Sequence, residues 1–255
     1  MVSHHIANPA KADLVKTVLD MTGVKKTYPG PPAVTALYGI DLRIQAGEFA
    51  AIIGPSGSGK STLLNVASGL EHPSEGRVVL AGIDLAALGA KELTNLRRWK
   101  LSFVFQSFNL FPVLTALENV EYPLLVRGDK LQSAREEAME ALRLVGLVDR
   151  AGHLPSKLSG GQQQRVAVAR ALAMHPAIIF ADEPTANLDS RNALQLIELF
   201  VSLNASHGMT FLLSTHDHRI VDRAGRRIQI EDGKIALDHH VRGEDVLQSQ
   251  TILRT

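Results

Sequence analysis

The sequence predicts a protein of the α/β class, in which helices cover both faces of a mostly parallel sheet. Two short apolar segments, residues 49–53 and 177–181, have the length and composition of buried strands. Helical segments follow them along the chain. From about residue 115 to 146 the apolar residues recur at helical spacing, and this change predicts a helical subdomain inserted into the sheet domain.

The other elements are predicted from local patterns. Ala138, Leu142 and Val145 define one apolar face of the inserted helical stretch. In chain order, we expect strands at 18–28 and 40–44 with a turn at 29–32, a helix at about 60–68, strands at 78–81 and 101–106, a helix at about 159–174, a helix, strand and helix within 192–221, and a closing hairpin over 227–235.

Composition excludes several function classes. Of 255 residues, 45% are hydrophobic and 21% are charged, an ordinary balance for a globular protein. The absence of cysteine excludes disulfides, thiolate metal ligands and cysteine nucleophiles. The formal net charge of +1 argues against a dedicated nucleic-acid surface. No apolar run approaches the roughly 18 residues of a membrane span, and residues 1–11 do not resemble a signal peptide. If the protein acts at a membrane, we expect another chain to span it.

A glycine-rich loop joins the strand at 49–53 to the helix that follows. Glycines let consecutive backbone N–H groups converge on an anion, and a helix N-terminus adds partial positive charge. Lys60 is expected to reach the outer phosphates of a nucleotide, and Ser61 to offer its hydroxyl to Mg²⁺. A turn that binds nothing is the alternative, but the complete motif between a strand and a helix favours phosphate binding. The predicted nucleotide contacts are Gly54, Pro55, Ser56, Gly57, Ser58, Gly59, Lys60, Ser61 and Thr62.

A second motif consists of an apolar strand that ends in two carboxylates, Asp182 and Glu183. A strand of a parallel sheet delivers such residues to the carboxyl edge, where the phosphate loop also lies. Asp182 is expected to hold Mg²⁺, directly or through water. Glu183 is expected to polarise the attacking water, as a general base or by orienting it. Alone, this pattern would indicate a surface turn, and its pairing with the phosphate loop reverses that interpretation.

The sequence Leu158-Ser159-Gly160-Gly161-Gln162 opens a helix, with Ser159 as a good N-cap. Alone it would indicate only a capped helix. It resembles, however, the signature motif of ABC (ATP-binding cassette) ATPases, and it lies between the phosphate loop and the Asp-Glu strand, as in that family. The resemblance extends over residues 18–235. It implies an ABC nucleotide-binding domain, with a P-loop NTPase core, an N-terminal antiparallel β subdomain and an inserted helical subdomain.

The resemblance also implies roles for single residues outside the two motifs. Tyr28 matches the aromatic residue that stacks on adenine, although an ordinary edge-strand aromatic is the alternative. Gln106 matches the glutamine that contacts Mg²⁺ and water and relays to the membrane partner. Asp189 matches the loop that crosses the dimer interface. His216 matches the histidine that contacts the γ-phosphate, whereas a lone histidine after a strand would usually be structural.

A head-to-tail dimer is expected from these assignments. Ser159, Gly161 and Gln162, with Gly160 beside them, match residues that contact the γ-phosphate of ATP bound to the opposite subunit. We expect the phosphate loop and the signature to lie too far apart on one copy to share a nucleotide. In a dimer, each signature helix dipole faces the other copy's γ-phosphate. ATP with Mg²⁺ then joins the copies, and hydrolysis loosens them.

All the expected catalytic residues are present, which predicts an active ATPase. They are Glu183, His216, Gln106 and Lys60, and the expected metal contacts are Ser61, Gln106 and Asp182.

Residues 108–112, here called the docking segment, follow a predicted strand and contain Phe108, Phe111 and Pro112. Exposed apolar groups at this position suggest a docking groove. In the ABC family this region receives a helix of the membrane permease subunit. The alternative is a locally buried loop.

Four motifs, at residues 105–112, 114–120, 160–167 and 181–185, resemble the lipoprotein-releasing and macrolide-export ATPases, although Ala186 stands where glycine is commoner in that group. This resemblance implies export or extraction of a lipid, lipoprotein or amphipathic substrate, at the cytoplasmic face of the inner membrane and with a periplasmic adaptor reached through the permease. A cell-division ATPase that drives a periplasmic enzyme is the alternative. A soluble ABC ATPase acting on nucleic acid fits the charge less well.

We expect the ATPase domain at 17–236, its helical subdomain at about 107–175, and terminal extensions of unknown role at 1–16 and 237–255.

Overall fold

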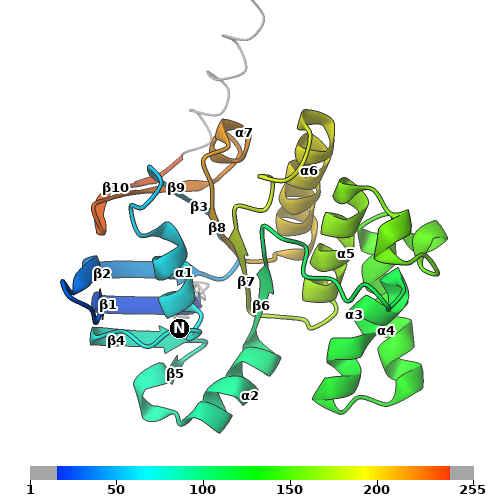
Figure 1. The fold of residues 1–255 in the computed structure, drawn as a ribbon, viewed down its shortest axis with the longest axis horizontal. Helices are drawn as coiled ribbons and strands as arrows, with labels where there is room; N and C mark the ends of the chain where they lie inside the picture. Colours follow the sequence, from blue (N-terminus) through cyan, green and yellow to red (C-terminus); the bar gives the residue numbers. More distant parts are fainter. Residues whose placement is uncertain (1–15, 242–255) are drawn as a thin grey trace, which may run out of the picture.

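The computed structural model describes residues 16–241 as two β-sheets with helices beside them (Figure 1). The strands are β1 (Thr17–Tyr28), β2 (Val34–Gln45), β3 (Phe49–Ile53), β4 (Glu75–Leu80), β5 (Ile83–Asp84), β6 (Leu101–Val104), β7 (Ile178–Asp182), β8 (Phe211–Ser214), β9 (Arg226–Glu231) and β10 (Lys234–His240). The α-helices are α1 (Lys60–Ala67), α2 (Ala90–Lys100), α3 (Ala116–Arg127), α4 (Leu131–Leu144), α5 (Gly160–Leu172), α6 (Ser190–His207) and α7 (His218–Val221).

The larger sheet has the strand order β10-β9-β3-β8-β7-β6. From β9 to β6 every neighbouring pair is parallel, and β10 runs antiparallel to β9. The smaller sheet, β2-β1-β4-β5, is antiparallel throughout. This arrangement confirms the predicted α/β class, with a mostly parallel core sheet and an antiparallel β region near the N-terminus.

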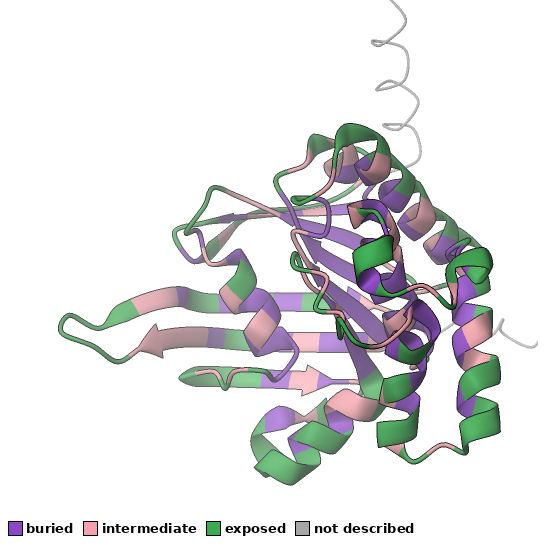
Figure 2. Ribbon diagram, turned by 45° about the vertical axis from the view of Figure 1, so that its right-hand side comes forward, coloured by how far each residue is buried: buried purple, intermediate pink, exposed green. Residues whose placement is uncertain are grey.

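The larger sheet separates two hydrophobic clusters. Along β7, Ile178 and Phe180 belong to the cluster that includes α1, whereas Ile179 and Ala181 belong to the cluster that includes α5 and α6. This alternation follows from the pleat, which sends successive side chains to opposite faces. A strand buried on both faces must be apolar at every position, which explains the continuous apolar runs in the sequence. Figure 2 shows the buried residues gathered in these strands.

Helices α3, α4 and α5 pack against one another beside β6 and form the inserted helical subdomain (Figure 1). Ala138, Leu142 and Val145 are buried, as predicted. The helical pattern predicted over 115–146 is divided between two helices. Gly128 ends α3 in a left-handed conformation (φ 106°), which glycine adopts without the steric cost of a Cβ. Helix α4 begins after Lys130.

Some predicted boundaries were wrong. The strand predicted over 101–106 ends at Val104, so Gln106 lies in the turn that follows. Helix α2 was not predicted; only Leu93 and Leu96 in it are buried, too few for a clear helical pattern. Strand β10 continues past residue 236 to His240; the C-terminal extension at 237–255 stays a prediction, and residues 242–255 lie outside the described residues. Of the predicted N-terminal extension, 1–16, only Lys16 is described.

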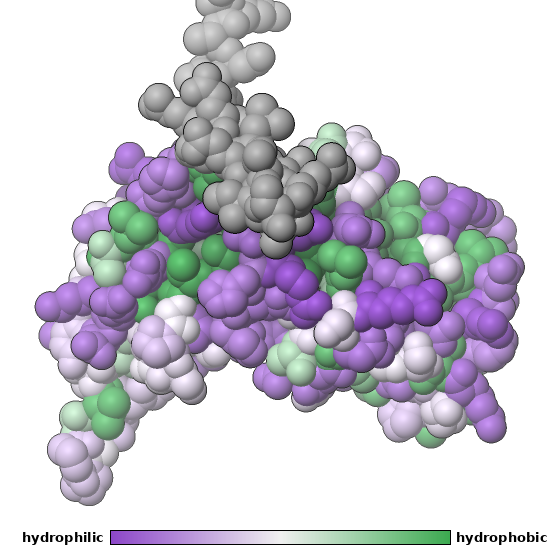
Figure 3. Space-filling model, turned by 90° about the horizontal axis from the view of Figure 1, so that it is seen from above, coloured by the Kyte–Doolittle hydropathy of each residue, from purple (hydrophilic) through white to green (hydrophobic). Residues whose placement is uncertain are grey.

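Within residues 16–241, no helix is both long enough and apolar enough to cross a membrane. On the face shown in Figure 3, hydrophobic residues lie in separate groups between polar ones.

Candidate functional site

The phosphate loop connects β3 to α1. Gly59, the N-cap of α1, has a left-handed φ of 105° and provides no side-chain hydrogen bond to the helix. The first N–H groups of α1 therefore have no side-chain cap, which is the condition in which a helix N-terminus binds an anion. A Cβ added to Gly54 would lie 2.2 Å from the carbonyl oxygen of Ile230, so only glycine fits where the loop leaves β3.

Lys60 folds back over this loop. Its Nζ donates hydrogen bonds to the carbonyl oxygens of Gly54 (2.8 Å) and Pro55 (2.9 Å). The residue is only 9% exposed. Both partners are neutral carbonyls, so these bonds leave the positive charge of the ammonium available to an anion at the helix N-terminus.

A hydroxyl and a carboxylate meet beside the phosphate loop. Ser61, at the start of α1, donates from Oγ to Oδ1 of Asp182 at 3.1 Å. Asp182 is the last residue of β7, and Ser214 on β8 donates to the same oxygen. Hydroxyl and carboxylate oxygens are ligands that Mg²⁺ prefers, and it commonly binds through one or two protein oxygens together with substrate phosphates. The donor set of Ser61 and Asp182 fits such a magnesium site.

Glu183 and His216 form a pair at the carboxyl ends of β7 and β8. Oε2 of Glu183 lies 2.8 Å from Nδ1 of His216. The Glu183 side chain is 17% exposed and that of His216 is 70% exposed. Glu183 has a left-handed backbone (φ 47°), an uncommon conformation for a residue with a Cβ. Its N–H is held by the main-chain carbonyl of Ser214 (3.1 Å). Such a pair can orient a water molecule and contact a phosphate.

His216 also lies beside the phosphate loop. A pocket of about 300 Å³ contains both His216 and Gly54, and its lining is Ile53, Gly54, Thr215, His216, His218, Val221 and Gln229. The structure thus brings together Lys60, Ser61, Asp182, Glu183 and His216 at one edge of the core sheet.

Gln106 joins this edge from β6. Val104 of β6 pairs with Ala181 of β7, so Gln106 and Glu183 each lie two residues beyond paired positions. Gln106 is exposed, and its main-chain oxygen accepts a hydrogen bond from Nδ2 of Asn187 at 3.1 Å.

Tyr28 ends β1 and lies beside α1. Its hydroxyl donates to Oε2 of Glu71 at 2.7 Å, and Nζ of Lys26 lies 4.9 Å from the ring centroid. Burial raises the pKa of the Tyr28 hydroxyl above its ordinary value, and a hydrogen bond with Thr62 of α1 opposes that shift. The ring is therefore fixed next to the helix that starts the nucleotide site, a position suited to stacking on a base.

The signature residues begin α5. Ser159 and Gln162 form a capping box: Oγ of Ser159 accepts from the Gln162 N–H at 3.3 Å, and Oε1 of Gln162 accepts from the Ser159 N–H at 2.9 Å. Two of the donors at this helix start are thus satisfied within the motif.

The glycines of the signature pack closely against neighbouring loops. A Cβ on Gly161 would lie 2.2 Å from Oδ1 of Asn192, whereas a Cβ on Gly160 would lie 3.6 Å from the Phe108 ring, an ordinary contact. Asn192 in turn binds Asp189, the N-cap of α6. Hydrogen bonds from the Asn192 backbone and side chain hold the pKa of the Asp189 carboxyl below its ordinary value.

The structure does not bring the signature to the phosphate loop of the same chain. Leu63 and Leu64 of α1 belong to one hydrophobic cluster, and Val166 and Ala169 of α5 belong to the other. The two helices therefore pack on opposite faces of the core sheet (Figure 1).

Sequence analysis missed three residues that support these sites. Ser214 contacts both Asp182 and Glu183, Glu71 holds the Tyr28 hydroxyl, and Asn192 fixes Asp189 beside Gly161. Only Ser214 carried a signal, as a polar residue ending an apolar strand next to His216. Glu71 and Asn192 look like ordinary surface residues until the fold is known.

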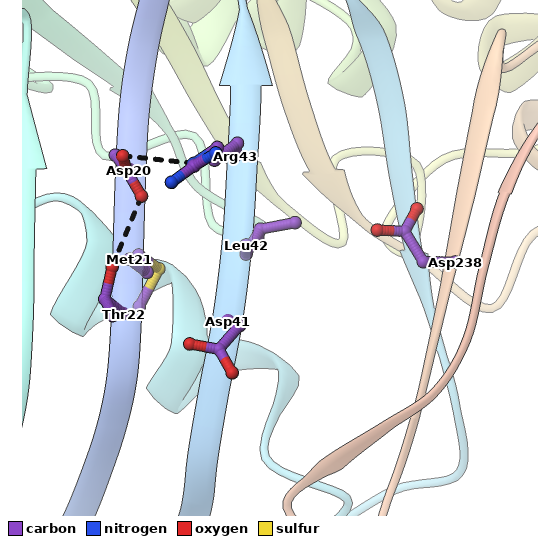
Figure 4. Close-up of a pocket in the computed structure, with 7 residues that line it drawn as sticks. All are labelled: Asp20, Met21, Thr22, Asp41, Leu42, Arg43 and Asp238. Carbon is purple, nitrogen blue, oxygen red and sulfur yellow. Dashed lines mark hydrogen bonds and ion pairs between the residues drawn. The ribbon is translucent and has the colours of Figure 1, made fainter.

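A further pocket lies between the small sheet and β10, away from these motifs (Figure 4). It contains Asp20, Asp41 and Asp238, and Nε of Arg43 lies 3.1 Å from Oδ2 of Asp20. Within the part of the chain that the structure describes, no group of three or more histidine, aspartate or glutamate side chains is arranged to hold a metal ion.

Comparisons with known proteins agree with the arrangement of the motifs. The ABC transporter family model matches residues 37–186. The lipoprotein-releasing system ATP-binding protein LolD of Anaeromyxobacter dehalogenans is 47% identical over 222 residues, covering 86% of this chain and 93% of that protein. The macrolide export ATP-binding/permease protein MacB of Rhodopirellula baltica is 42% identical over 91% of this chain, which corresponds to 34% of MacB.

A solved structure has the same fold. It is the dimeric, post-hydrolysis state of the ATP-binding cassette MJ0796 bound to ADP and Pi, with a TM-score of 0.81 and 44% identity over 88% of this chain and 99% of that chain. The chain belongs to the ABC transporter family and is an ATP-binding, ATP-hydrolysing transporter subunit.

Proposed function

We propose that two copies of this chain bind ATP between them, head to tail, and thereby drive a separate membrane permease. The observation that carries this proposal is the position of α1 and α5 on opposite faces of one sheet. One copy therefore holds two half-sites that face different nucleotides. The similarity to a cassette solved as a dimer with ADP and Pi supports the same assembly here.

Within each shared site, the phosphate loop binds the phosphates of ATP. Lys60 and the N-terminus of α1 supply positive charge, and Pro55, Ser56, Gly57 and Ser58 supply the loop around the phosphates. Ser61 and Asp182, with Gln106, would hold Mg²⁺, which would neutralise phosphate charge. Tyr28 stacks on adenine, with its hydroxyl held by Glu71 at 2.7 Å, and Thr62 of α1 contacts the nucleotide.

Glu183 is the residue that polarises the attacking water. Its carboxylate is mostly buried, and the strained backbone of the residue is fixed by Ser214, so the side chain is held in one place. His216 contacts the γ-phosphate. Ser159, Gly160, Gly161 and Gln162 of the other copy complete the site, and Asp189 lies in the loop that crosses the interface.

The permease docks on residues 108–112. The exposure of Phe111 (44%) and of Val113 next to the segment (80%) supports docking of an apolar surface here, whereas Phe108 is half-buried. Relatives that join an ATP-binding part to a permease in one protein, such as MacB, support a permease partner. The subunit then lies at the cytoplasmic face of the inner membrane, with a periplasmic adaptor reached through the permease.

The substrate class follows from the relatives alone. LolD and MacB are named for lipoprotein release and macrolide export, which favours export or extraction of a lipid, lipoprotein or amphipathic compound. We further propose that residues 17–236 are the ATPase domain, that residues 107–175 are its helical subdomain, and that residues 1–16 and 237–255 are terminal extensions.

The test compares the wild-type chain with its Glu183→Gln variant, with ATP and Mg²⁺, by light scattering and phosphate release. We expect the variant to form dimers with ATP and to release phosphate at least about 100-fold more slowly, the usual contribution of a positioned general base. Monomers in both samples, with unchanged phosphate release in the variant, would contradict the shared site and the role of Glu183.

A further inference from the structure

Helix α5 extends from the signature to a half-buried arginine, Arg170, near its other end. It runs from Gly160 to Leu172, about 20 Å at 1.5 Å per residue. A helix of this length moves as a rigid unit, because each turn is hydrogen bonded to the next. A segment that is fixed to α5 therefore moves with the signature.

The docking segment lies along this helix and is hydrogen bonded to its last turn. Nη1 of Arg170 donates to the carbonyl oxygen of Asn109 at 2.6 Å, and Nη2 donates to that of Phe108 at 3.1 Å. At the first turn of α5, the Phe108 ring lies 3.6 Å from the position of a Cβ on Gly160. The segment is thus hydrogen bonded to the last turn of α5, and the Phe108 ring lies beside Gly160 at the first turn.

Arg170 makes these bonds from a half-buried position. Burial lowers the pKa of its guanidinium below the ordinary value. The groups that receive its hydrogen bonds are main-chain carbonyls of the docking segment, which are neutral. Because the partly desolvated guanidinium is stabilised by the dipoles of these two carbonyls, moving them away from Arg170 costs free energy.

The far end of the docking segment is held by the same subdomain. Asn119 of α3 is fully buried. Its Oδ1 accepts from the Phe111 N–H at 2.7 Å, and its Nδ2 donates to the carbonyls of Phe111 (3.1 Å) and Leu114 (2.8 Å). The segment therefore has side-chain anchors on α3 and α5.

We propose that Arg170 is a positioning residue that fastens the docking segment to the signature helix, so that ATP-driven closure at Ser159–Gln162 of α5 is transmitted to residues 108–112. This inference rests on the proposed function, because it assumes that the signature closes on the ATP of a second copy. It adds the residue that makes the docking segment follow that closure.

The test measures hydrogen exchange of residues 107–114 in the full chain, with and without ATP and Mg²⁺. The chain carries Glu183→Gln so that dimers persist, and it is compared with the same chain carrying Arg170→Met, Arg170→Lys or Arg143→Met. Arg143, on α4, is exposed and pairs with Glu140, so its variant controls for the loss of an arginine from the subdomain. Light scattering on the same samples reports dimers.

With Arg170 intact, ATP is expected to change exchange in residues 107–114. In Arg170→Met, basal exchange there rises about tenfold, the effect of losing a hydrogen bond to a charged group, and the ATP-driven change disappears although dimers form. Arg170→Lys keeps the positive charge and one donor group, so its ATP-driven change in exchange is expected to be intermediate. It provides a second variant if the methionine variant folds poorly. Arg143→Met retains the full ATP-driven change.

Two other results would each contradict a proposal. An ATP-driven change that is equal in Arg170→Met and in the chain with Arg170 would overturn the inference, because Arg170 would then be only a structural contact. Absence of ATP-driven dimers in the chain that keeps Arg170 would contradict the proposed function itself and the transmission that depends on it.

Discussion

Two glycine-rich helix starts, at α1 and at α5, have opposite local chemistry. The start of α1 has a left-handed glycine as N-cap and no side-chain cap, and Lys60 lies over it. The start of α5 has a complete capping box between Ser159 and Gln162. An uncapped helix start with a nearby ammonium can bind an anion by itself, whereas a capped start has part of its donor set already occupied. The comparison indicates that one copy binds nucleotide through α1 and contributes α5 to the nucleotide of another.

The largest expected effect separates these two starts in the monomer. Lys60→Ala removes charge-assisted hydrogen bonds to phosphate, worth about 2 kcal/mol, and we expect ATP to bind about 30-fold more weakly. Ser159→Ala leaves monomer affinity unchanged, because α5 lies on the other face of the sheet. Calorimetric titration of dilute, monomeric chain with ATP checks both values. Equal losses in the two variants would place both helix starts at one nucleotide.

A smaller effect distinguishes the two glycines of the signature. Gly161→Ala forces a Cβ into Asn192 and is expected to lower the free energy of unfolding by about 1–3 kcal/mol, the cost of overpacking. Gly160→Ala has only ordinary contacts, with Phe108 nearest, and is expected to be neutral or slightly stabilising. Urea unfolding without nucleotide measures both. Similar stability of the two variants would mean that Asn192 does not hold Gly161 in place.

The smallest effect is a pH dependence beside the signature. The pKa of Asp189 is lower in the folded protein than in the unfolded chain, because Asn192 donates to its carboxylate. The stability that Asp189 contributes is therefore present above its unfolded pKa of about 4 and is lost as the pH falls through its folded pKa. Thermal unfolding of wild type and Asp189→Ala from pH 3 to pH 7 is expected to show a difference at neutral pH that shrinks at acid pH. A constant difference across this range would exclude titration of Asp189 as its cause.

Much of the nucleotide site was predictable because its motifs are local. The phosphate loop and the Asp-Glu strand each lie within a few consecutive residues, and parallel strands bring their carboxyl ends to one edge. Ser61 and Asp182 met there as expected, although the chain separates them by 121 residues. The signature motif alone indicated only a capped helix, and its role was assigned from resemblance to a family.

The remaining features depend on tertiary packing. Helix α2 has few buried positions and Glu183 adopts a left-handed backbone, and neither is encoded by a periodic pattern. The bonds from Arg170 to Phe108 and Asn109 join main-chain carbonyls, which carry no sequence signal. Such contacts become visible only when the helical subdomain is placed beside β6.

The most direct test of the central claim mixes two inactive variants. Lys60→Ala disables the phosphate loop, and Ser159→Phe blocks the signature at an exposed position. In a head-to-tail dimer of one of each, both defects fall in one shared site and the other site is intact. Phosphate release is therefore expected to recover to about one quarter of the wild-type rate, because random mixing makes about half of the dimers mixed and each has one intact site of two. A mixture no more active than its two components, although dimers form, would contradict the shared site.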